Sequence, residues 1–296
     1  MVLAGEKITL LYILGTAQFG LDYGVNNVVG KPSEDEVFSL LSTAYDNGIT
    51  ALDTAARYGD SERLIGKFQS VAGKMFDLHS KFSGEGSLAD EVQLTLKNLC
   101  VDRLSLYYLH RYDDCSDNSI IDVLKALKAD GVIERIGISV YTCDELFYVL
   151  DNLNDIVDVV QIPFSVVDCA RWVSALKAAD DAGMMIYCRS IFLQGALFKS
   201  LDDGFIAKYN AGGHLRVVHD MCVKYNCSVE CFAISFVAGF EGISGILFGC
   251  ETLEQLRRNI DMQRNAIDIS KCDFDFVVDK MKDVSPEFID PRQWKE

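Results

Sequence analysis

The stretch SEDEVFSLLSTAYDNGITALD, residues 33–53, decides the fold. Its first part predicts a helix over residues 33–47, because apolar side chains recur there with the spacing of one helix face. Ser33 and Glu36 form a capping-box pattern at its start, and Gly48 follows where helices often end in a left-handed residue. The apolar run 49–52 predicts a short strand, and Asp53 lies at its far end.

This unit of helix, glycine, strand and polar residue recurs along the chain. Residues 117–139 and 168–190 repeat it, and less sharply marked units fill the rest. Alternating helices and strands predict a parallel sheet, and eight units in one chain favour a closed (β/α)8 TIM barrel, an α/β fold of a single domain. An open doubly wound sheet is less favoured, because residues 15–20 do not form a GxGxxG loop. The strand candidates are residues 11–14, 49–52, 75–80, 104–109, 133–138, 157–160, 184–188 and 243–248.

Charge and hydropathy exclude several classes of protein. The 296 residues include 44 acidic and 28 basic side chains, a net charge of −16, which argues against nucleic acid as a partner. No run approaches about 20 apolar residues, so no membrane span is expected. The N-terminus lacks the basic region and cleavage site of a secretion signal. We therefore expect a cytoplasmic protein, a monomer or small homo-oligomer, that acts on a small molecule.

The cysteines agree with a reducing compartment. There are ten, with no CxxC pair, which indicates reduced thiols. Cys222, Cys227 and Cys231, with His219 before them, offer metal-ligand atoms, but their spacing matches no standard zinc signature. Because free cysteines commonly pack in cores, we expect core packing here and no metal site.

Polar side chains at the strand ends mark the candidate active site. In a parallel barrel the carboxyl ends of the strands converge on one face, where active sites lie. A nearby ammonium lowers the pKa of a phenol, and a carboxylate keeps a buried ammonium charged, so an acid, a lysine and a tyrosine together can move a proton. An imidazole can then orient a substrate oxygen. The residues concerned are Asp53, Lys81, His110, Ser139, Gln161 and Ser190, with Tyr58 expected at the start of the helix after Asp53.

The acid, the lysine, the imidazole and the tyrosine of this set also allow structural interpretations. Asp53 can cap the following helix, Lys81 can end its strand facing solvent, and His110 can be a satisfied core histidine. Tyr58 alone says little among twelve tyrosines. The functional interpretation depends on one topology that places all four on the same face.

The motifs, taken in order, resemble the aldo-keto reductase superfamily. LDTAARYGDSE (residues 52–62), Lys81 after the third strand and LYYLH (106–110) match its signature. GIS (137–139), Gln161 and RSIFLQG (189–195) continue the match, and the last has a form found in bacterial members. The resemblance covers residues 14–260 and implies one barrel over residues 1–296, with a C-terminal tail, residues 272–296, over the active-site face.

The resemblance implies a carbonyl reductase or alcohol dehydrogenase that uses NADP(H) or NAD(H) without a Rossmann fold. The family's catalytic tetrad would be Asp53, Tyr58, Lys81 and His110. Ser139 and Gln161 would hold the nicotinamide carboxamide, and residues 190–195 would wrap the pyrophosphate. Asn259 would contact adenine, with Gln255 near the 2′-phosphate. The implied cofactor contacts are Gly15, Thr16, Asp53, Ser139, Gln161, Arg189, Ser190, Phe192, Leu193, Gln194, Gly195, Gly249, Gln255 and Asn259.

Three positions depart from the family pattern. Val140 replaces the usual asparagine, which removes one carboxamide hydrogen bond. Arg189 stands where many members have an aromatic ring that stacks on nicotinamide, although a guanidinium plane also stacks. Gly249 replaces a lysine that pairs with the 2′-phosphate; Arg257 and Arg258 either compensate or form surface ion pairs. We expect NADP(H) rather than NAD(H) on family habit alone, so this preference stays open.

Loops after the strands and the C-terminal tail set specificity in such barrels. Arg111 either meets an anionic substrate group or forms a surface ion pair with a nearby aspartate. Bacterial proteins with this pattern often accompany polysaccharide or sugar biosynthesis, which favours a sugar-like or polyol carbonyl. The expected pocket walls are Phe19, Tyr23, Phe82, Arg111, Tyr112 and Phe164, with the tail around Phe288 and Trp294.

Two functions of other kinds stay open. The same fold also serves as a nucleotide-sensing regulatory subunit, but a binder needs neither Tyr58 nor Lys81. A cofactor-free hydrolase would use Asp53 with another carboxylate, and it would bind no nicotinamide cofactor.

Overall fold

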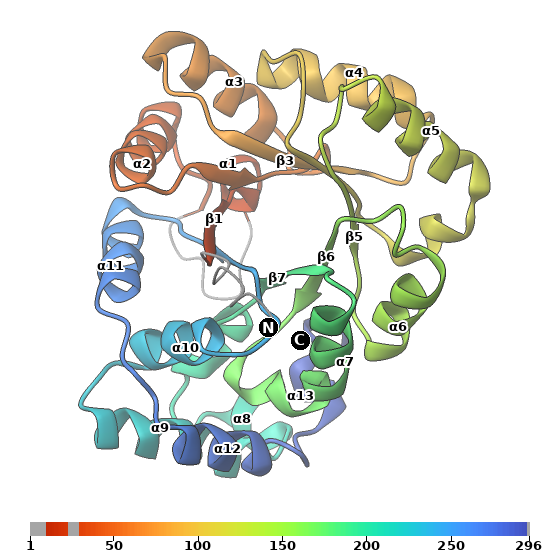
Figure 1. Ribbon diagram of the computed structural model, residues 1–296. Coiled ribbons are helices and arrows are strands. Elements are labelled where there is room, and N and C mark those ends of the chain that lie inside the picture. Colours follow the sequence, from red (N-terminus) through yellow and green to blue (C-terminus); the bar gives the residue numbers. More distant parts are fainter. Residues whose placement is uncertain (1–9, 23–29, 295–296) are drawn as a thin grey trace, which may run out of the picture.

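Eight parallel strands surrounded by helices form the molecule in a computed structural model, which describes residues 10–22 and 30–294 (Figure 1). Each strand pairs with the next along the chain, and β8 pairs with β1, so the sheet closes into a barrel. This confirms the predicted single-domain (β/α)8 fold. The strands are β1 Leu11–Gly15, β2 Ala51–Asp53, β3 Asp77–Phe82, β4 Leu106–Leu109, β5 Ile136–Ser139, β6 Val159–Pro163, β7 Met185–Arg189 and β8 Gly245–Gly249.

Helices follow the strands and cover the outside of the barrel (Figure 1). Beyond β8, α12 and α13 belong to the C-terminal segment. The α-helices are α1 Ala17–Gly20, α2 Glu34–Asp46, α3 Ser61–Ala72, α4 Leu88–Leu99, α5 Asn118–Ala129, α6 Cys143–Asn152, α7 Cys169–Asp181, α8 Gly204–Lys208, α9 Gly212–Tyr225, α10 Val229–Ala238, α11 Leu253–Arg264, α12 Lys271–Lys280 and α13 Pro286–Ile289. Short 3-10 turns are η1 Tyr112–Ser116, η2 Val166–Asp168, η3 Leu193–Phe198 and η4 Pro291–Gln293.

The structure contains the eight predicted strands in the predicted order, and the strand bounds differ from the predicted bounds by a few residues. Ile49 and Ile133 lie before their strands; Ile133 makes only an isolated bridge to Leu104. Apolar side chains in those approaches are buried like strand residues, so composition alone does not mark where pairing starts.

The predicted cap at Ser33 is present, and later helices begin with similar caps. Ser33 Oγ accepts a hydrogen bond from the Glu36 amide, and the Glu36 carboxylate accepts one from the Ser33 amide. Thr142 and Glu145 form the same reciprocal box, whereas Gln255 turns to the Glu251 amide. These side chains satisfy amides that the first helical turn leaves without partners.

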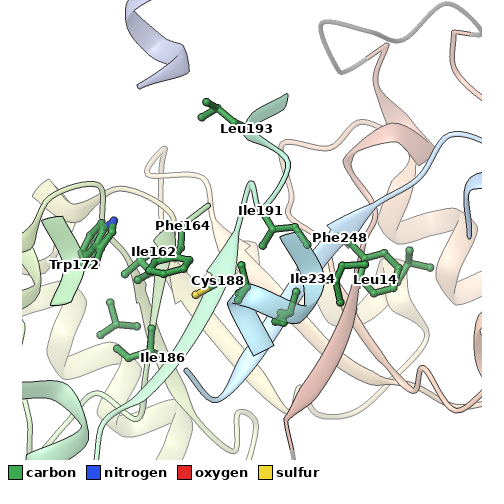
Figure 2. Close-up of a cluster of buried hydrophobic side chains, with 14 of the residues drawn as sticks. Leu14, Ile162, Phe164, Trp172, Ile186, Cys188, Ile191, Leu193, Ile234 and Phe248 are labelled. Atoms are coloured by element: carbon green, nitrogen blue, oxygen red, sulfur yellow. The ribbon is translucent and has the colours of Figure 1, made fainter. Parts of the chain in front are cut away.

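Two apolar layers hold the barrel together. Outward-facing strand residues pack against the helices: Ile162, Ile186 and Cys188 lie in one cluster with Trp172 of α7 and Ile234 of α10 (Figure 2). Because successive strand residues point to opposite faces, the intervening residues fill the barrel interior. That inner cluster comprises Ile13, Ala51, Leu106, Tyr108, Val159, Tyr187 and Leu247.

Two glycines make room for the largest inner rings. A Cβ atom at Gly137 would lie 2.3 Å from the Tyr108 ring, and one at Gly245 would lie 2.7 Å from the Tyr187 ring. Tyr187 in turn stacks on His79, with ring centroids 5.9 Å apart. Aromatic rings therefore close the barrel interior below the strand ends.

In the described ranges, no single helix is both long and apolar enough to cross a membrane, although α9 and α10 taken together pass the same test across a bend of 94°. All ten cysteines carry free thiols. Cys222 and Cys231 are buried against the core, and within residues 10–22 and 30–294 no set of His, Cys, Asp or Glu side chains is arranged to hold a metal ion.

Candidate active site

Strand periodicity alone brings the predicted residues together. Each lies two positions beyond an inward-facing residue of its strand, so its side chain belongs to the same inner face at the carboxyl end. Asp53 follows Ala51 in this way, and Arg189 follows Tyr187. The strand-end set is Gly15, Asp53, Lys81, His110, Ser139, Gln161, Arg189 and Gly249.

A buried ion pair lies at the centre of this set. The Lys81 ammonium donates to Asp53 Oδ1 and, at 3.0 Å, to the Thr54 carbonyl. Gln161 Nε2 donates to the other oxygen of Asp53 at 2.9 Å. Lys81 is 1% exposed, so the solvent-facing interpretation of this lysine is wrong. The carboxylate of Asp53 is occupied by Lys81 and Gln161 and does not cap α3, which begins at Ser61 after Asp60.

Tyr58 and His110 lie over that pair. The Lys81 ammonium is 5.3 Å from the centroid of the Tyr58 ring. The rings of Tyr58 and His110 meet edge to face, with centroids 6.1 Å apart. Tyr58 was predicted at the start of the helix after Asp53, but it lies in the preceding turn, three residues before α3 begins at Ser61. Both rings are partly exposed, so a ligand at the barrel mouth can reach them.

Burial and charge set the protonation of two of these groups. Burial, together with the positive charges of Lys81 and Arg189, lowers the pKa of His110 to about 3, so its imidazole is neutral at physiological pH. Burial also lowers the pKa of Lys81, and the carboxylate of Asp53 opposes that shift. The arrangement keeps a neutral hydrogen-bonding imidazole beside a carboxylate-supported amine.

Two glycines fix the backbone of Tyr58. A Cβ atom at Gly20 would lie 1.7 Å from the Tyr58 carbonyl oxygen, and one at Gly59 would lie 2.4 Å from the Gly20 carbonyl oxygen. Gly59 also has a φ of +54°, a conformation that glycine adopts without strain. The turn carrying Tyr58 thus packs directly on the end of α1. The sequence-based prediction overlooked this pair, although both glycines are visible in the sequence.

A polar network beneath the site holds β2 in place. Thr16 Oγ1 donates to the Asp53 carbonyl at 3.0 Å, and Ser61 Oγ donates to Thr16 Oγ1 at 2.8 Å. The buried carboxylate of Glu62 accepts from Ser80 at 2.7 Å and Thr95 at 3.1 Å. Thr16, which we expected to touch a cofactor, is fully buried and supports Asp53 through this network.

Segment 190–195 after β7 adopts a strained backbone. Ser190, Leu193 and Gln194 have φ values of +61°, +47° and +49°, which non-glycine residues rarely adopt, and Gly195 has +90°. Such strain is concentrated at ligand-binding sites, where the surrounding structure stabilises it. Phe192 is partly exposed at the start of this turn.

The predicted adenosine end lies along α11. Gly249 is exposed at the end of β8, Gln255 is exposed, and Asn259 is 7% exposed. Arg258 forms ion pairs with the carboxylates of Glu254 at 3.2 Å and Glu230 at 3.6 Å. This agrees with the interpretation of Arg258 as part of a surface ion pair. Val140 is buried at the end of β5.

The side chains expected to line the substrate pocket lie in different environments. Phe19, Phe82 and Phe164 are buried, and Phe164 alone of the described walls lines a cavity beside the strand ends. Arg111 Nη2 pairs with Asp114 at 2.7 Å and binds the Gly84 carbonyl, as in the ion-pair interpretation. Tyr112 packs edge to face on Tyr148, and Tyr23 lies outside the described residues. Phe288 is buried, and Trp294 donates to its carbonyl.

A closed parallel barrel with a titratable cluster at the carboxyl ends of its strands defines a TIM-barrel enzyme architecture. The sequence model of the aldo/keto reductase family matches residues 12–275. The chain therefore belongs to the aldo/keto reductase family, whose members are oxidoreductases that act on carbonyl compounds.

Several proteins with different named activities are similar to this chain in sequence. The NADH-specific methylglyoxal reductase of Escherichia coli is 23% identical over 73% of this chain and 79% of its own length. The D-threo-aldose 1-dehydrogenase of a Pseudomonas species is 26% identical over 83% and 90%. An aldo-keto reductase of Strobilurus tenacellus is 34% identical, but the match spans 43% of this chain and 40% of that relative.

Among solved structures, the holo form of an aldo-keto reductase from Bacillus halodurans superposes with a TM-score of 0.73 at 18% identity. It covers 95% of both chains. At that identity the likeness concerns the fold.

Proposed function

We propose that this protein reduces an aldehyde or ketone to an alcohol, or catalyses the reverse reaction, with a nicotinamide cofactor and with Tyr58 as the general acid or base. The observation that carries the proposal is the buried Lys81–Asp53 pair beneath Tyr58, beside a neutral His110. A buried ammonium held charged by a carboxylate costs folding energy. Placing it under a phenol that faces the barrel mouth fits proton transfer.

The chain's own groups perform the proton half of the reaction. When bound, the nicotinamide ring supplies the hydride that adds to the carbonyl carbon. Tyr58 donates its hydroxyl proton to the carbonyl oxygen, and Lys81 stabilises the phenolate that remains. Asp53 keeps Lys81 charged and in place, and the neutral His110 donates a hydrogen bond that orients the carbonyl. In alcohol oxidation Tyr58 accepts the proton.

The strand ends fit such a cofactor. The strained turn at residues 190–195 follows β7 directly, and Gly249 leaves the end of β8 without a side chain. Buried Ser139 and Gln161 lie at neighbouring strand ends, paired in register, where they would hold the carboxamide. We keep NADP(H) as the expected cofactor, with Arg257 as the cation for its 2′-phosphate, because Arg258 is already paired.

Titration of the protein with NADPH and with NADH tests this proposal, with quenching of tryptophan or tyrosine emission as the readout. We expect binding at micromolar concentrations, tighter for NADPH. Tighter binding of NADH would overturn the cofactor preference and match the name of the Escherichia coli relative. No binding of either at millimolar concentration would contradict the reductase proposal and favour the cofactor-free alternative.

The remaining assignments form part of the same proposal. The tail beyond residue 272 would cover the substrate side of the barrel mouth, and the substrate would be a sugar-like or polyol carbonyl, which the name of the Pseudomonas relative supports. A cytoplasmic location would supply reduced cofactor. A panel of aldehydes separates this substrate class from simple aromatic aldehydes, which should be reduced more slowly.

A further inference from the structure

A cavity of about 680 Å³ lies between the carboxyl ends of β5 to β7 and residues 281–293 of the C-terminal segment. No residue of β8 or α11, where the adenosine end of a cofactor would lie, contributes to its lining. Arg189, Ser190, Leu193 and Gln194 do line it, so the cavity adjoins the turn proposed to hold the pyrophosphate and is separate from the adenosine end alone. The lining residues that matter here are Tyr141, Ser165, Asp168, Arg171, Arg189 and Arg292.

Arg189 is the exceptional cation in this cavity. Its guanidinium packs on the ring of Tyr141 at 4.3 Å, and its Nη2 atom is buried without an acceptor. Among the described residues no carboxylate pairs with it. The guanidinium stays charged at all relevant pH values, and a buried charged donor without a partner is costly.

The other two arginines of the cavity are neutralised. Arg171 donates to the buried carboxylate of Asp168 at 2.8 Å, and Arg292 donates to Asp290 at 2.8 Å. Arg292 also stacks on Tyr141, at 3.6 Å. These pairs build a rigid polar wall, and they leave Arg189 with the uncompensated charge.

Ser165 provides a second unsatisfied donor in the same wall. It is 1% exposed, and no atom of residues 10–22 or 30–294 forms a hydrogen bond with its hydroxyl. Buried hydroxyls are nearly always hydrogen-bonded, so an unpaired one that lines a cavity indicates a missing ligand atom. A guanidinium and a hydroxyl together match the acceptor-only oxygens of a carboxylate or phosphate.

We propose that this cavity binds the anionic end of the substrate, a carboxylate or phosphate ester, through Arg189 and Ser165. The inference rests on the proposed function, which places the reacting carbonyl at Tyr58. Arg189 belongs to the same inner face of the strand ends as Lys81, so the guanidinium and the proposed reaction site lie at the same end of the barrel. The chain as a whole has a net charge of −16, whereas this wall holds an unpaired arginine and therefore favours an anionic ligand.

Matched pairs of aldehydes test the proposal. The ratio of kcat/KM for 4-carboxybenzaldehyde over 4-formylbenzamide, and for glyceraldehyde 3-phosphate over glyceraldehyde, reports anion recognition, and the two pairs separate carboxylate from phosphate. We expect one of the ratios to be about tenfold or higher in the unmodified protein, as for a charged hydrogen bond. Arg189→Gln should bring that ratio to about one, Arg189→Lys should restore part of it, and Ser165→Ala should lower it severalfold.

Arg103→Gln is the control, because Arg103 is an exposed surface arginine paired with Glu134. It should keep the unmodified ratio. Binding of 4-(hydroxymethyl)benzoate against 4-(hydroxymethyl)benzamide, followed by tryptophan emission, gives a readout without turnover. Tryptophan emission can report this binding because Trp172 donates a hydrogen bond to Asp168 in the cavity wall. Trp294 donates one to the Phe288 carbonyl in the C-terminal segment.

Several outcomes decide against the proposal. Ratios near one for both aldehyde pairs, with cofactor binding and turnover intact, would remove the anion site and leave the reductase function standing. A loss of cofactor affinity in Arg189→Gln with an unchanged ratio would assign Arg189 to the cofactor. If no cofactor binds, the reductase function fails, and the benzoate measurement alone then decides whether the cavity is an anion site.

Discussion

Tyr58 carries the proton in the proposed reaction, so its hydroxyl is the sharpest test at the scale of one residue. We expect Tyr58→Phe to lower kcat by about two to four orders of magnitude, the usual contribution of a positioned general acid. Cofactor affinity, measured by fluorescence, should stay within twofold, since the ring remains in place. Unchanged turnover in this variant would contradict the role of Tyr58 as general acid. No turnover in the unmodified protein, while cofactor still binds, would favour a nucleotide-sensing subunit.

His110 gives a second test, through pH. Its pKa is lowered to about 3, so the imidazole stays neutral from pH 5 to 8 and does not titrate over the assay range. We therefore expect the profile of kcat/KM for carbonyl reduction to show no ionisation between pH 6 and 7. A step in that range that disappears in His110→Asn would show that the histidine titrates there and would contradict the neutral role.

At the scale of elements, the contact between α1 and the turn before α3 positions Tyr58. Gly20→Ala places a methyl group against the Tyr58 carbonyl, so the turn must move by an ångström or more. Displacements of that size cost about a hundredfold in rate. We expect kcat to fall by at least tenfold while the circular dichroism spectrum persists. Gly213→Ala is the matched control, because a Cβ there meets nothing within 4 Å.

Comparison of the strand ends with the cavity shows what the sequence could predict. Asp53, Lys81 and Gln161 follow from strand periodicity and chain order, because each is fixed by its own strand. The wall around Arg189 does not follow, since it joins β7 to residues about a hundred positions later, and no local pattern encodes that contact. Phe19 was expected in the pocket and lies in the core, because an aromatic side chain looks the same in sequence at either place.

At the scale of the whole molecule, His79 links stability to pH. It lies inside the barrel at 0% exposure, neither ring nitrogen has a partner within the described part of the chain, and burial lowers its pKa to about 3. In the unfolded chain this histidine has a pKa of about 6.5, so below that pH the unfolded chain binds a proton that the native barrel does not bind. The free energy of unfolding therefore falls as the pH falls from about 6.5 toward 3.

His79→Phe removes this proton uptake and keeps a ring to stack on Tyr187. From pH 7.5 to 5, the unfolding free energy of the unmodified protein should fall by about 2 kcal/mol more than that of the variant. Urea denaturation at the two pH values measures the difference. Equal slopes in the two proteins would mean that His79 titrates in the native barrel as it does in the unfolded chain, which would contradict this prediction.

The cavity wall built by residues 281–293 has an evolutionary consequence. The groups proposed for proton transfer lie at or just beyond the carboxyl ends of β2, β3 and β4, whereas this wall is built by residues that follow β8 and belongs to none of those strands. Substitutions in residues 281–293 can therefore accumulate under selection for a different substrate without disturbing Tyr58 or its supports. Related chains of this family can in this way differ in the compounds that they bind while they keep the same groups at the strand ends.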